Sequence, residues 1–226
     1  MTNKDYVSVV YNETDRPLTS YPNKLTKHLT DRFELKKGDK LLDVGCGRGE
    51  FLNGFSRCGL NCFGVDQSLV ANDFFPNLSI KQVDMESGKL PFEDETFDAI
   101  FSKSVIEHFY RPEILLKELY RILKPGGKII TMTPDWEVIY KMFYDDYTHR
   151  TPFTLLSLKD IKIIHGFEQV LVEKFLQLPS VWKFPIIMPF CCVIGRISPK
   201  FLRNRYKFLR FSYEMMLLSF AKKPIN

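Results

Sequence analysis

A glycine-rich segment, DVGCGRG over residues 43–49, follows an apolar run and precedes a stretch with helical spacing. Glycines allow backbone angles that other residues avoid, so the main chain at Gly45 and Gly47 can approach a ligand closely. A nucleotide-binding loop is the predicted role. The GxGxxG loop of NAD-binding proteins is the first alternative, and it holds a pyrophosphate against a helix N-terminus. Here the third glycine comes one residue early, and Glu50 would oppose that pyrophosphate.

Three aspartates follow successive predicted strands. Asp43 places negative charge beside the loop, where a cationic amine or sulfonium would be favoured. Asp66 lies 21 residues after Gly45, a spacing at which a carboxylate accepts from both ribose hydroxyls. Asp84 is placed to accept from an adenine amino group, with Met85 against the ring. Each aspartate alone is as well explained as a helix cap or turn residue, but all three together favour S-adenosylmethionine over NAD.

Strands and helices alternate along the chain. Apolar runs predict strands at residues 40–44, 61–65, 79–83, 97–102, 128–132, 167–176 and 213–221. Helical spacing and stop signals predict helices at about 18–35, 50–58, 112–123 and 157–166, the last capped by Ser157 and Gly166. This rhythm predicts a mostly parallel sheet with helices on both faces. In such folds, ligands bind beyond the carboxyl ends of the strands.

Four stretches resemble the class I S-adenosylmethionine-dependent methyltransferases in sequence and in order. They are LLDVGCGRGEF, GVDQS, VDMESGKLPFEDETFDAIFSKSVIEHF and LLKELYRILKPGGKIITMTP, within residues 38–135. The resemblance implies a Rossmann-like α/β fold with a seven-stranded sheet whose last strand is antiparallel. It also implies cofactor contacts: the methionine portion at Gly45 and Gly47, the ribose at Asp66, the adenine at Asp84 and Met85, and the sulfonium at the backbone of Ser102. Asp43, Cys46 and Gln67 flank these positions and are expected to contact the cofactor too.

Two histidines are the candidate catalytic residues. The sulfonium methyl group is already activated, so a base is needed only if the acceptor must lose a proton. His108 follows the fourth predicted strand, at the edge that faces the site, and its alternative role is to fix the loop by hydrogen bonds. His149 lies in a Thr-His segment whose counterpart in relatives borders the acceptor pocket, and it is either an acceptor-side residue or a support for the loop.

The segment Ser104–His108 also resembles the Glu-x-x-Glu-His stretch of ubiquinone-type O-methyltransferases, where carboxylates and histidine can bind a divalent ion. Ser104 replaces the first glutamate, which leaves Glu107 and His108. Two adjacent ligands make a poor site alone, so we predict no required metal.

The C-terminal part combines apolar and basic segments. Residues 178–195 (LPSVWKFPIIMPFCCVIG) are strongly apolar, but Lys183 and three prolines interrupt them, and they are too short to span a bilayer. Residues 196–226 carry a net charge of +7, whereas the preceding 195 residues sum to −2. Apolar insertion combined with cations favours reversible attachment to an anionic membrane through residues 178–212. The alternative is a lid over the acceptor pocket; nucleic-acid binding is disfavoured.

The chain is expected to form a single methyltransferase domain. Its expected parts are an N-terminal helical extension (1–37), a cofactor-binding core (38–135), an acceptor-side region (136–177) and the apolar and basic insertion (178–212). Five cysteines without paired spacing indicate reduced thiols, and no signal peptide is apparent. We therefore expect a cytoplasmic protein, peripheral on the inner face of a membrane if the insertion docks there.

The predicted function is methyl transfer from S-adenosylmethionine to a small-molecule or lipid- or glycan-linked acceptor, at oxygen. The alternatives are an NAD-dependent oxidoreductase of Rossmann fold and a non-catalytic, methyltransferase-like membrane protein. The presence of all three aspartates argues against the second alternative. Neither the acceptor nor the oligomeric state is indicated by the residues.

Overall fold

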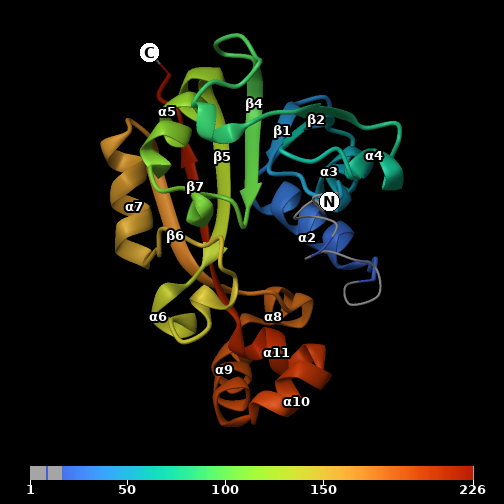
Figure 1. Cartoon of the computed structure of the whole chain (residues 1–226), viewed down its shortest axis with the longest axis vertical. Helices are drawn as coiled ribbons and strands as arrows, with labels where there is room; N and C mark the ends of the chain where they lie inside the picture. Colours follow the sequence, from blue (N-terminus) through green and yellow to red (C-terminus); the bar gives the residue numbers. More distant parts are fainter. Residues whose placement is uncertain (1–8, 10–16, 226) are drawn as a thin grey trace, which may run out of the picture.

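The computed structural model describes residue 9 and residues 17–225 (Figure 1). Its centre is a seven-stranded sheet with the strand order β3-β2-β1-β4-β5-β7-β6. The strands are β1 (Lys40–Val44), β2 (Asn61–Asp66), β3 (Ser79–Gln82), β4 (Phe97–Lys103), β5 (Leu123–Pro134), β6 (Glu168–Leu176) and β7 (Met215–Lys222). All seven predicted strands are present.

The direction of the strands places the site. The strands β1 to β5 pair in parallel, whereas β7 is antiparallel to both β5 and β6. The predicted antiparallel last strand is therefore confirmed. Strand order reverses between β1 and β4, and the carboxyl ends of the parallel strands meet at the edge to which the β4 arrow points in Figure 1. Ligands bind at such a switch point in open α/β sheets.

Helices cover both faces of the sheet (Figure 1). The main ones are α2 (Tyr21–Arg32), α3 (Glu50–Arg57), α4 (Ala71–Phe74), α5 (Pro112–Ile122), α6 (Trp136–Ile139), α7 (Leu155–Ile164), α8 (Pro179–Lys183), α9 (Met188–Ile197), α10 (Lys200–Arg205) and α11 (Lys207–Tyr213). Single 3-10 turns are η1 (Met85–Ser87), η2 (Ile106–His108), η3 (Phe143–Asp145) and η4 (Pro185–Ile187). None of the described helices has the length and hydropathy needed to cross a bilayer.

The core forms on both faces of the central strands because successive side chains of a strand point in opposite directions. On β4, Ile100 packs with Leu119 of α5 and Leu158 of α7 in one cluster. Its neighbour Phe101 packs on the other face with Phe55 of α3, in a cluster that includes residues of α2. This two-sided burial explains why the central strands are continuous apolar runs.

Three boundaries differ from the predictions. β5 begins at Leu123, before the Pro-Gly-Gly turn that was expected to separate helix and strand, because Leu123 already pairs with Phe97. α7 begins at Leu155, because its N-cap is Thr154 and not Ser157, three residues further on: Thr154 Oγ1 accepts from Ser157 N–H, and Ser157 Oγ accepts from Thr154 N–H. The helix expected at 18–35 is the shorter α2, and residues 1–8 and 10–16 of the predicted extension lie outside the described residues.

Candidate functional site

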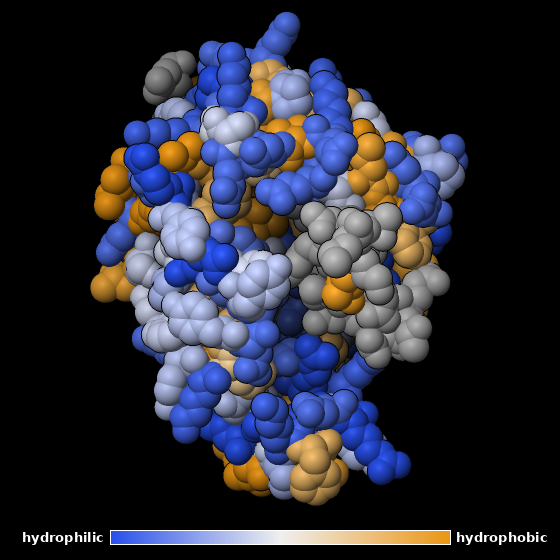
Figure 2. Space-filling model, viewed as in Figure 1, coloured by the Kyte–Doolittle hydropathy of each residue, from blue (hydrophilic) through white to orange (hydrophobic). Residues whose placement is uncertain are grey.

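A cavity of about 590 Å³ opens at the carboxyl edge of the sheet. Figure 2 shows the surface hollowed near the middle of that view, at the height of this edge in Figure 1. Its volume lies in the range of small-molecule and cofactor sites. Its lining residues are Gly45, Cys46, Gly47, Arg48, Glu50, Phe51, Asp66, Gln67, Ser68, Met85, Glu86, Lys103, Ser104, Val105, His108, Phe109, Tyr110, Tyr147, Thr148 and Arg150.

The glycine loop forms one wall because its backbone takes conformations and contacts that a side chain would prevent. Gly45 has φ +70°, and a Cβ there would lie 2.3 Å from Val105 Cγ2. Gly47 has φ +52°, and a Cβ there would meet nothing within 4 Å. The N–H groups of Gly45 and Cys46 both donate to the Val65 carbonyl (2.8 and 3.1 Å), which fixes the loop on β2. The backbone at Gly45 is therefore closed to larger residues, and Gly47 faces open space.

Asp66 is the last residue of β2, and its carboxylate binds the backbone of the glycine loop. Its Oδ2 accepts from Gly47 N–H (2.7 Å) and its Oδ1 from Ser68 N–H (2.9 Å). The residue is only 7% exposed and lines the cavity. Each carboxylate oxygen has two lone pairs, so the side chain can accept from a ligand while it anchors the loop.

Asp43 lies beneath the loop and does not line the cavity. It is 2% exposed, and its Oδ2 is buried without a hydrogen-bond partner among the described residues. Burial, and secondarily the charge of Asp66, raises the pKa of Asp43 well above its usual value. A buried carboxylate oxygen without a partner is costly unless a cation or donor reaches it. A donor or cation of a ligand bound near the glycine loop would relieve part of this cost.

Glu50 does not repel anions as the sequence suggested. Arg48 Nη2 lies 2.7 Å from Glu50 Oε2, and both side chains are largely buried, at 5% and 18% exposure. The Glu50 charge is thus balanced within the loop. Glu50 therefore gives no argument against an anionic ligand.

The other predicted cofactor contacts divide into two groups. Gln67 and Met85 line the cavity, whereas Asp84 and Ser102 do not. Asp84 Oδ1 accepts from Glu86 N–H (3.0 Å) and caps η1, which is the structural role considered for it above. Ser102 is 2% exposed and immediately precedes the lining residues at the end of β4. The adenine role of Asp84 stays a prediction.

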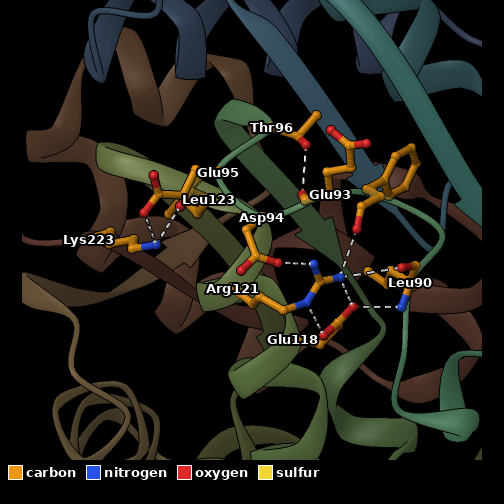
Figure 3. Close-up of polar contacts among 10 residues, drawn as sticks. Leu90, Glu93, Asp94, Glu95, Thr96, Glu118, Arg121, Leu123 and Lys223 are labelled. Carbon is orange, nitrogen blue, oxygen red and sulfur yellow. Dashed lines mark hydrogen bonds and ion pairs between the residues drawn. The ribbon is translucent and has the colours of Figure 1, made fainter.

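A network around Arg121 of α5 fixes the loop that follows β3 (Figure 3). The guanidinium donates to the Phe92 carbonyl (2.9 Å), to Asp94 Oδ1 (2.5 Å) and to both carboxylate oxygens of Glu118. Glu118 Oε1 also accepts from Leu90 N–H (2.7 Å). Burial alone would raise the pKa of Glu118, but the hydrogen bonds from Arg121 and Leu90 hold it below its usual value. The same loop carries cavity-lining residues, so this network supports the site from outside.

Arg121→Met is expected to lower the free energy of unfolding by about 2 kcal/mol at pH 7, because it leaves the Glu118 carboxylate buried without its cation. The pKa of Glu118 is depressed in the folded protein, so its stabilisation is complete above its unfolded pKa and is lost as the pH falls through the folded value. The difference from wild type should therefore shrink below about pH 4.5. Urea unfolding of wild type and variant at pH 7 and below about pH 4.5 measures this difference. Arg111→Met, which removes an exposed pair with Glu113, should change stability little.

His108 lies in η2 at the cavity wall, and Thr148 orients its ring. Thr148 Oγ1 donates to Asp146 Oδ1 (2.5 Å), so its lone pair accepts from His108 Nδ1–H (2.9 Å). This pattern assigns the lone pair of the ring to Nε2. Burial, followed by the neighbouring His149, lowers the pKa of His108. The imidazole is therefore neutral at pH 7 and able to accept a proton.

His149 lies behind His108 and does not line the cavity. Its Nδ1 donates to the Phe143 carbonyl (2.6 Å), and the two imidazole centroids are 4.8 Å apart. These contacts fit a support for the loop better than contact with an acceptor. A catalytic role for His149 stays a prediction.

Glu107 brings a third potential ligand to the two histidines. Within the described part of the chain, Glu107, His108 and His149 are the one group of this kind, with ligand atoms within 4.8 Å of one another. Glu107 is fully buried, its Oε2 accepts from Thr133 Oγ1 (2.9 Å), and burial raises its pKa to about 7. The sequence predicted no required metal because it offered only two adjacent ligands. The structure adds His149 as a third potential ligand, so the small number of ligands no longer argues against a metal. Measuring activity after removal of divalent ions tests the prediction that no metal is required.

Two cationic residues that line the cavity, Lys103 and Arg150, were not among the predicted site residues. Lys103 ends β4, so the strand-end rule that singled out the aspartates applies to it as well. The guanidinium of Arg150 lies over the Tyr110 ring (5.0 Å) and donates to the Tyr147 carbonyl (2.5 Å). These contacts join two loops that are distant in sequence, so no local sequence pattern predicts them. Lys103 and Arg150 thus add two cations to the lining of the cavity.

Comparison with known proteins identifies the family. A family model described as a methyltransferase domain matches residues 42–131. An uncharacterised protein of Methanocaldococcus jannaschii is 30% identical over 213 residues, which cover 91% of this chain and 89% of that protein. The sterol 4-C-methyltransferase of Caenorhabditis elegans is 31% identical over 134 residues, which cover 54% of this chain and 40% of that enzyme. The match thus spans less than half of the sterol enzyme.

A solved structure has the same fold. The phosphoethanolamine N-methyltransferase 2 of Haemonchus contortus, in complex with phosphomonomethylethanolamine and S-adenosylhomocysteine, matches with a TM-score of 0.69 at 20% identity. The match covers 99% of this chain and 60% of that one. The matched family sets aside the NAD-dependent alternative. This chain belongs to the S-adenosylmethionine-dependent methyltransferases and is an enzyme that uses that cofactor.

Proposed function

We propose that the enzyme methylates an oxygen atom of a small-molecule or lipid- or glycan-linked acceptor. The observation that carries this proposal is the neutral imidazole of His108 at the cavity wall, oriented by Thr148 and Asp146. A hydroxyl must lose its proton to become an effective nucleophile, and a neutral histidine is the usual acceptor of that proton near pH 7. The sterol and phosphoethanolamine enzymes to which the chain is similar act on other acceptors, so the choice of oxygen depends on this base.

The side chains of the cavity divide the work between cofactor and acceptor. Asp43 would balance the cofactor's positive charge, and Asp66 would accept from its ribose hydroxyls. Bound S-adenosylmethionine supplies an electrophilic methyl group. The protein then has to align the acceptor with that group and exclude water. His108 Nε2 takes the acceptor proton, and the carboxylate of Asp146, through Thr148, stabilises the imidazolium that forms.

Two cations in the cavity lining support an acceptor with an anionic substituent. Lys103 and Arg150 line the cavity, and a phosphate or carboxylate bound there could pair with either cation. A lipid- or glycan-linked phosphate has this chemistry. If the acceptor is held in a lipid surface, the enzyme works in the cytoplasm at the inner face of a membrane.

The acceptor can be identified directly. Cell-extract lipids and glycans are incubated with the enzyme and S-adenosylmethionine that carries a deuterated methyl group, and the products are fragmented by mass spectrometry. We expect the label on oxygen, in a product that bears a negatively charged group. A label found on nitrogen or carbon would overturn the assignment to oxygen.

His108→Asn is expected to lower kcat on that acceptor roughly 100-fold, because general-base catalysis contributes at least this much. Binding of S-adenosylhomocysteine should be unchanged. In the wild type, kcat/KM should rise with pH because the base form of His108 is required. Because the pKa of His108 is lowered, the plateau should already be reached below about pH 6.5. His165→Gln, in a histidine that does not line the cavity, is the control. An unchanged kcat in His108→Asn would remove the base from the mechanism.

A further inference from the structure

The insertion predicted at residues 178–212, which forms most of the segment between β6 and β7, presents an apolar stripe to solvent. In α9, the residues Phe190, Val193, Ile194 and Ile197 are 71%, 58%, 37% and 75% exposed. Their spacing is i, i+3, i+4 and i+7, which places them on one face of the helix. A helix in a globular protein normally turns such a face toward the core. Here the stripe points outward.

Packing on the opposite side of α9 holds the stripe in this orientation. Cys191 and Gly195 are buried, and a Cβ at Gly195 would lie 2.5 Å from the backbone of Ser212 in α11. Cys191 also belongs to a small cluster with Leu176 and Met215 at the edge of the sheet. The stripe cannot turn inward without breaking these contacts. Its exposure is therefore a fixed property of the fold.

Positive charge accompanies the stripe. The insertion contains no Asp or Glu and seven cations, which are Lys183, Arg196, Lys200, Arg203, Arg205, Lys207 and Arg210. Across the described chain, the one ion pair that any of these cations makes joins Arg210 to Glu214, just outside the insertion. Ile186 and Phe201, which precede and follow α9 in the sequence, are also 82% and 70% exposed. An apolar surface among unbalanced cations is thus built into this end of the molecule.

The insertion lies at the same edge of the sheet as the cavity. Figure 1 shows α9, α10 and α11 beyond the end to which β4 points, and residues that follow β1, β2 and β4 line the cavity. In Figure 2, hydrophobic atoms reach the surface at that end beside strongly hydrophilic ones. Among the described residues, none from 178–212 lines the cavity. This disfavours the lid that the sequence left as an alternative.

We propose that the insertion docks on an anionic lipid bilayer, with the stripe of α9 among the acyl chains and the cations at the headgroups. Aliphatic insertion and positive charge are the two contributions that stable peripheral binding needs together. A second copy of the chain fits less well, because its identical face would bring seven further cations against the first seven. Nucleic acid offers phosphates to the cations but nothing apolar to Val193, Ile194 and Ile197.

Docking would turn the cavity edge toward the bilayer. A lipid-linked acceptor would then reach His108 without leaving the membrane, and this consequence alone rests on the proposed function. The docking itself rests only on the stripe and the cations. The two proposals therefore succeed or fail separately.

The test is co-sedimentation of the intact chain with vesicles of phosphatidylcholine, alone or with about one third phosphatidylserine. We expect binding to the anionic vesicles and at least tenfold weaker binding to the neutral ones. Phe190→Ser with Ile197→Ser should weaken binding to anionic vesicles about tenfold or more. Lys200→Glu with Arg205→Glu should weaken it by a similar factor and should leave the weak binding to neutral vesicles unchanged.

Matched controls carry the same changes on the far side of the fold. Ile163→Ser with Ile164→Ser alters two residues of α7 that are 50% and 76% exposed, and Lys117→Glu with Lys159→Glu reverses two exposed charges on α5 and α7. Both should bind vesicles like the wild type. Every variant should keep the wild-type affinity for S-adenosylhomocysteine, which identifies any that fails to fold.

Several results would overturn the docking proposal. They are a wild type that does not bind anionic vesicles, stripe and charge variants that bind like the wild type, and a dimer that Phe190→Ser with Ile197→Ser dissociates. The last result would assign the stripe to a second copy. Methyl transfer that persists without vesicle binding counts against docking alone. Vesicle binding without any methylated product counts against the proposed function alone.

Discussion

Asp66→Ala is expected to weaken the binding of S-adenosylhomocysteine by about 4 kcal/mol, close to a thousandfold. The carboxylate is placed to accept from both ribose hydroxyls, and each hydrogen bond to a charged group contributes about 1.5–3 kcal/mol. It also accepts from Gly47 N–H and Ser68 N–H, so its removal takes an anchor from the glycine loop. Isothermal titration calorimetry measures the loss.

Two further variants make this result specific. Asp66→Asn keeps one acceptor oxygen, so its affinity for S-adenosylhomocysteine should lie between those of the wild type and Asp66→Ala. Asp84→Ala removes the cap of η1 outside the cavity lining. If capping is the whole role of Asp84, the variant should weaken S-adenosylhomocysteine binding by about 1 kcal/mol at most, and a larger loss would support the predicted adenine contact. If the loss at Asp84 matched or exceeded the loss at Asp66, the assignment of the ribose to Asp66 would be wrong.

Lys162→Met is expected to raise the free energy of unfolding by about 2 kcal/mol at pH 7. Lys162 is fully buried, and its Nζ donates to Thr131 Oγ1 (3.0 Å). Burial lowers its pKa from 10.5 to about 7, which corresponds to a cost to the fold of about 5 kcal/mol. Loss of the hydrogen bond to Thr131 and imperfect packing of the new side chain offset about half of that gain.

The pH dependence of stability tests the same residue. The unfolded chain binds more protons at Lys162 than the folded chain between about pH 7 and 10.5, so wild-type stability should rise with pH in that window. The rise should be absent in Lys162→Met. Urea unfolding at about pH 7 and pH 9.5 gives both quantities, with Lys159→Met on the exposed side of α7 as the control. A methionine variant that is less stable than wild type, or that keeps the rise, would refute the interpretation.

The cofactor side of the site was predictable because its signals are local. Gly45, Gly47 and Asp66 each lie next to the end of a predicted strand, and parallel strands bring those ends to one edge. The mostly parallel sheet was predictable for the same reason, because strands and helices alternate locally along the chain. The resemblance to a known family supplied the direction of the last strand, which local patterns do not contain.

The acceptor side was harder to predict because long-range packing creates it. Glu107 meets His149, and Arg150 meets Tyr110, only once the segment after β5 folds back over η2. The charge of Glu50 was misread for a related reason: a pattern of single residues does not show that Arg48 neutralises it. Side chains that act through a partner are the ones that sequence reasoning misses.

The pairing of β7 with both β5 and β6 has a consequence for synthesis on the ribosome. Until residues 215–222 have emerged, β5 and β6 have no common neighbour, and each presents an open strand edge. Open edges of this kind invite pairing with other chains. The exposed stripe of α9 emerges before β7 and adds an aggregation-prone apolar surface to the incomplete chain. Early engagement by a chaperone or a lipid surface would shield both during that interval.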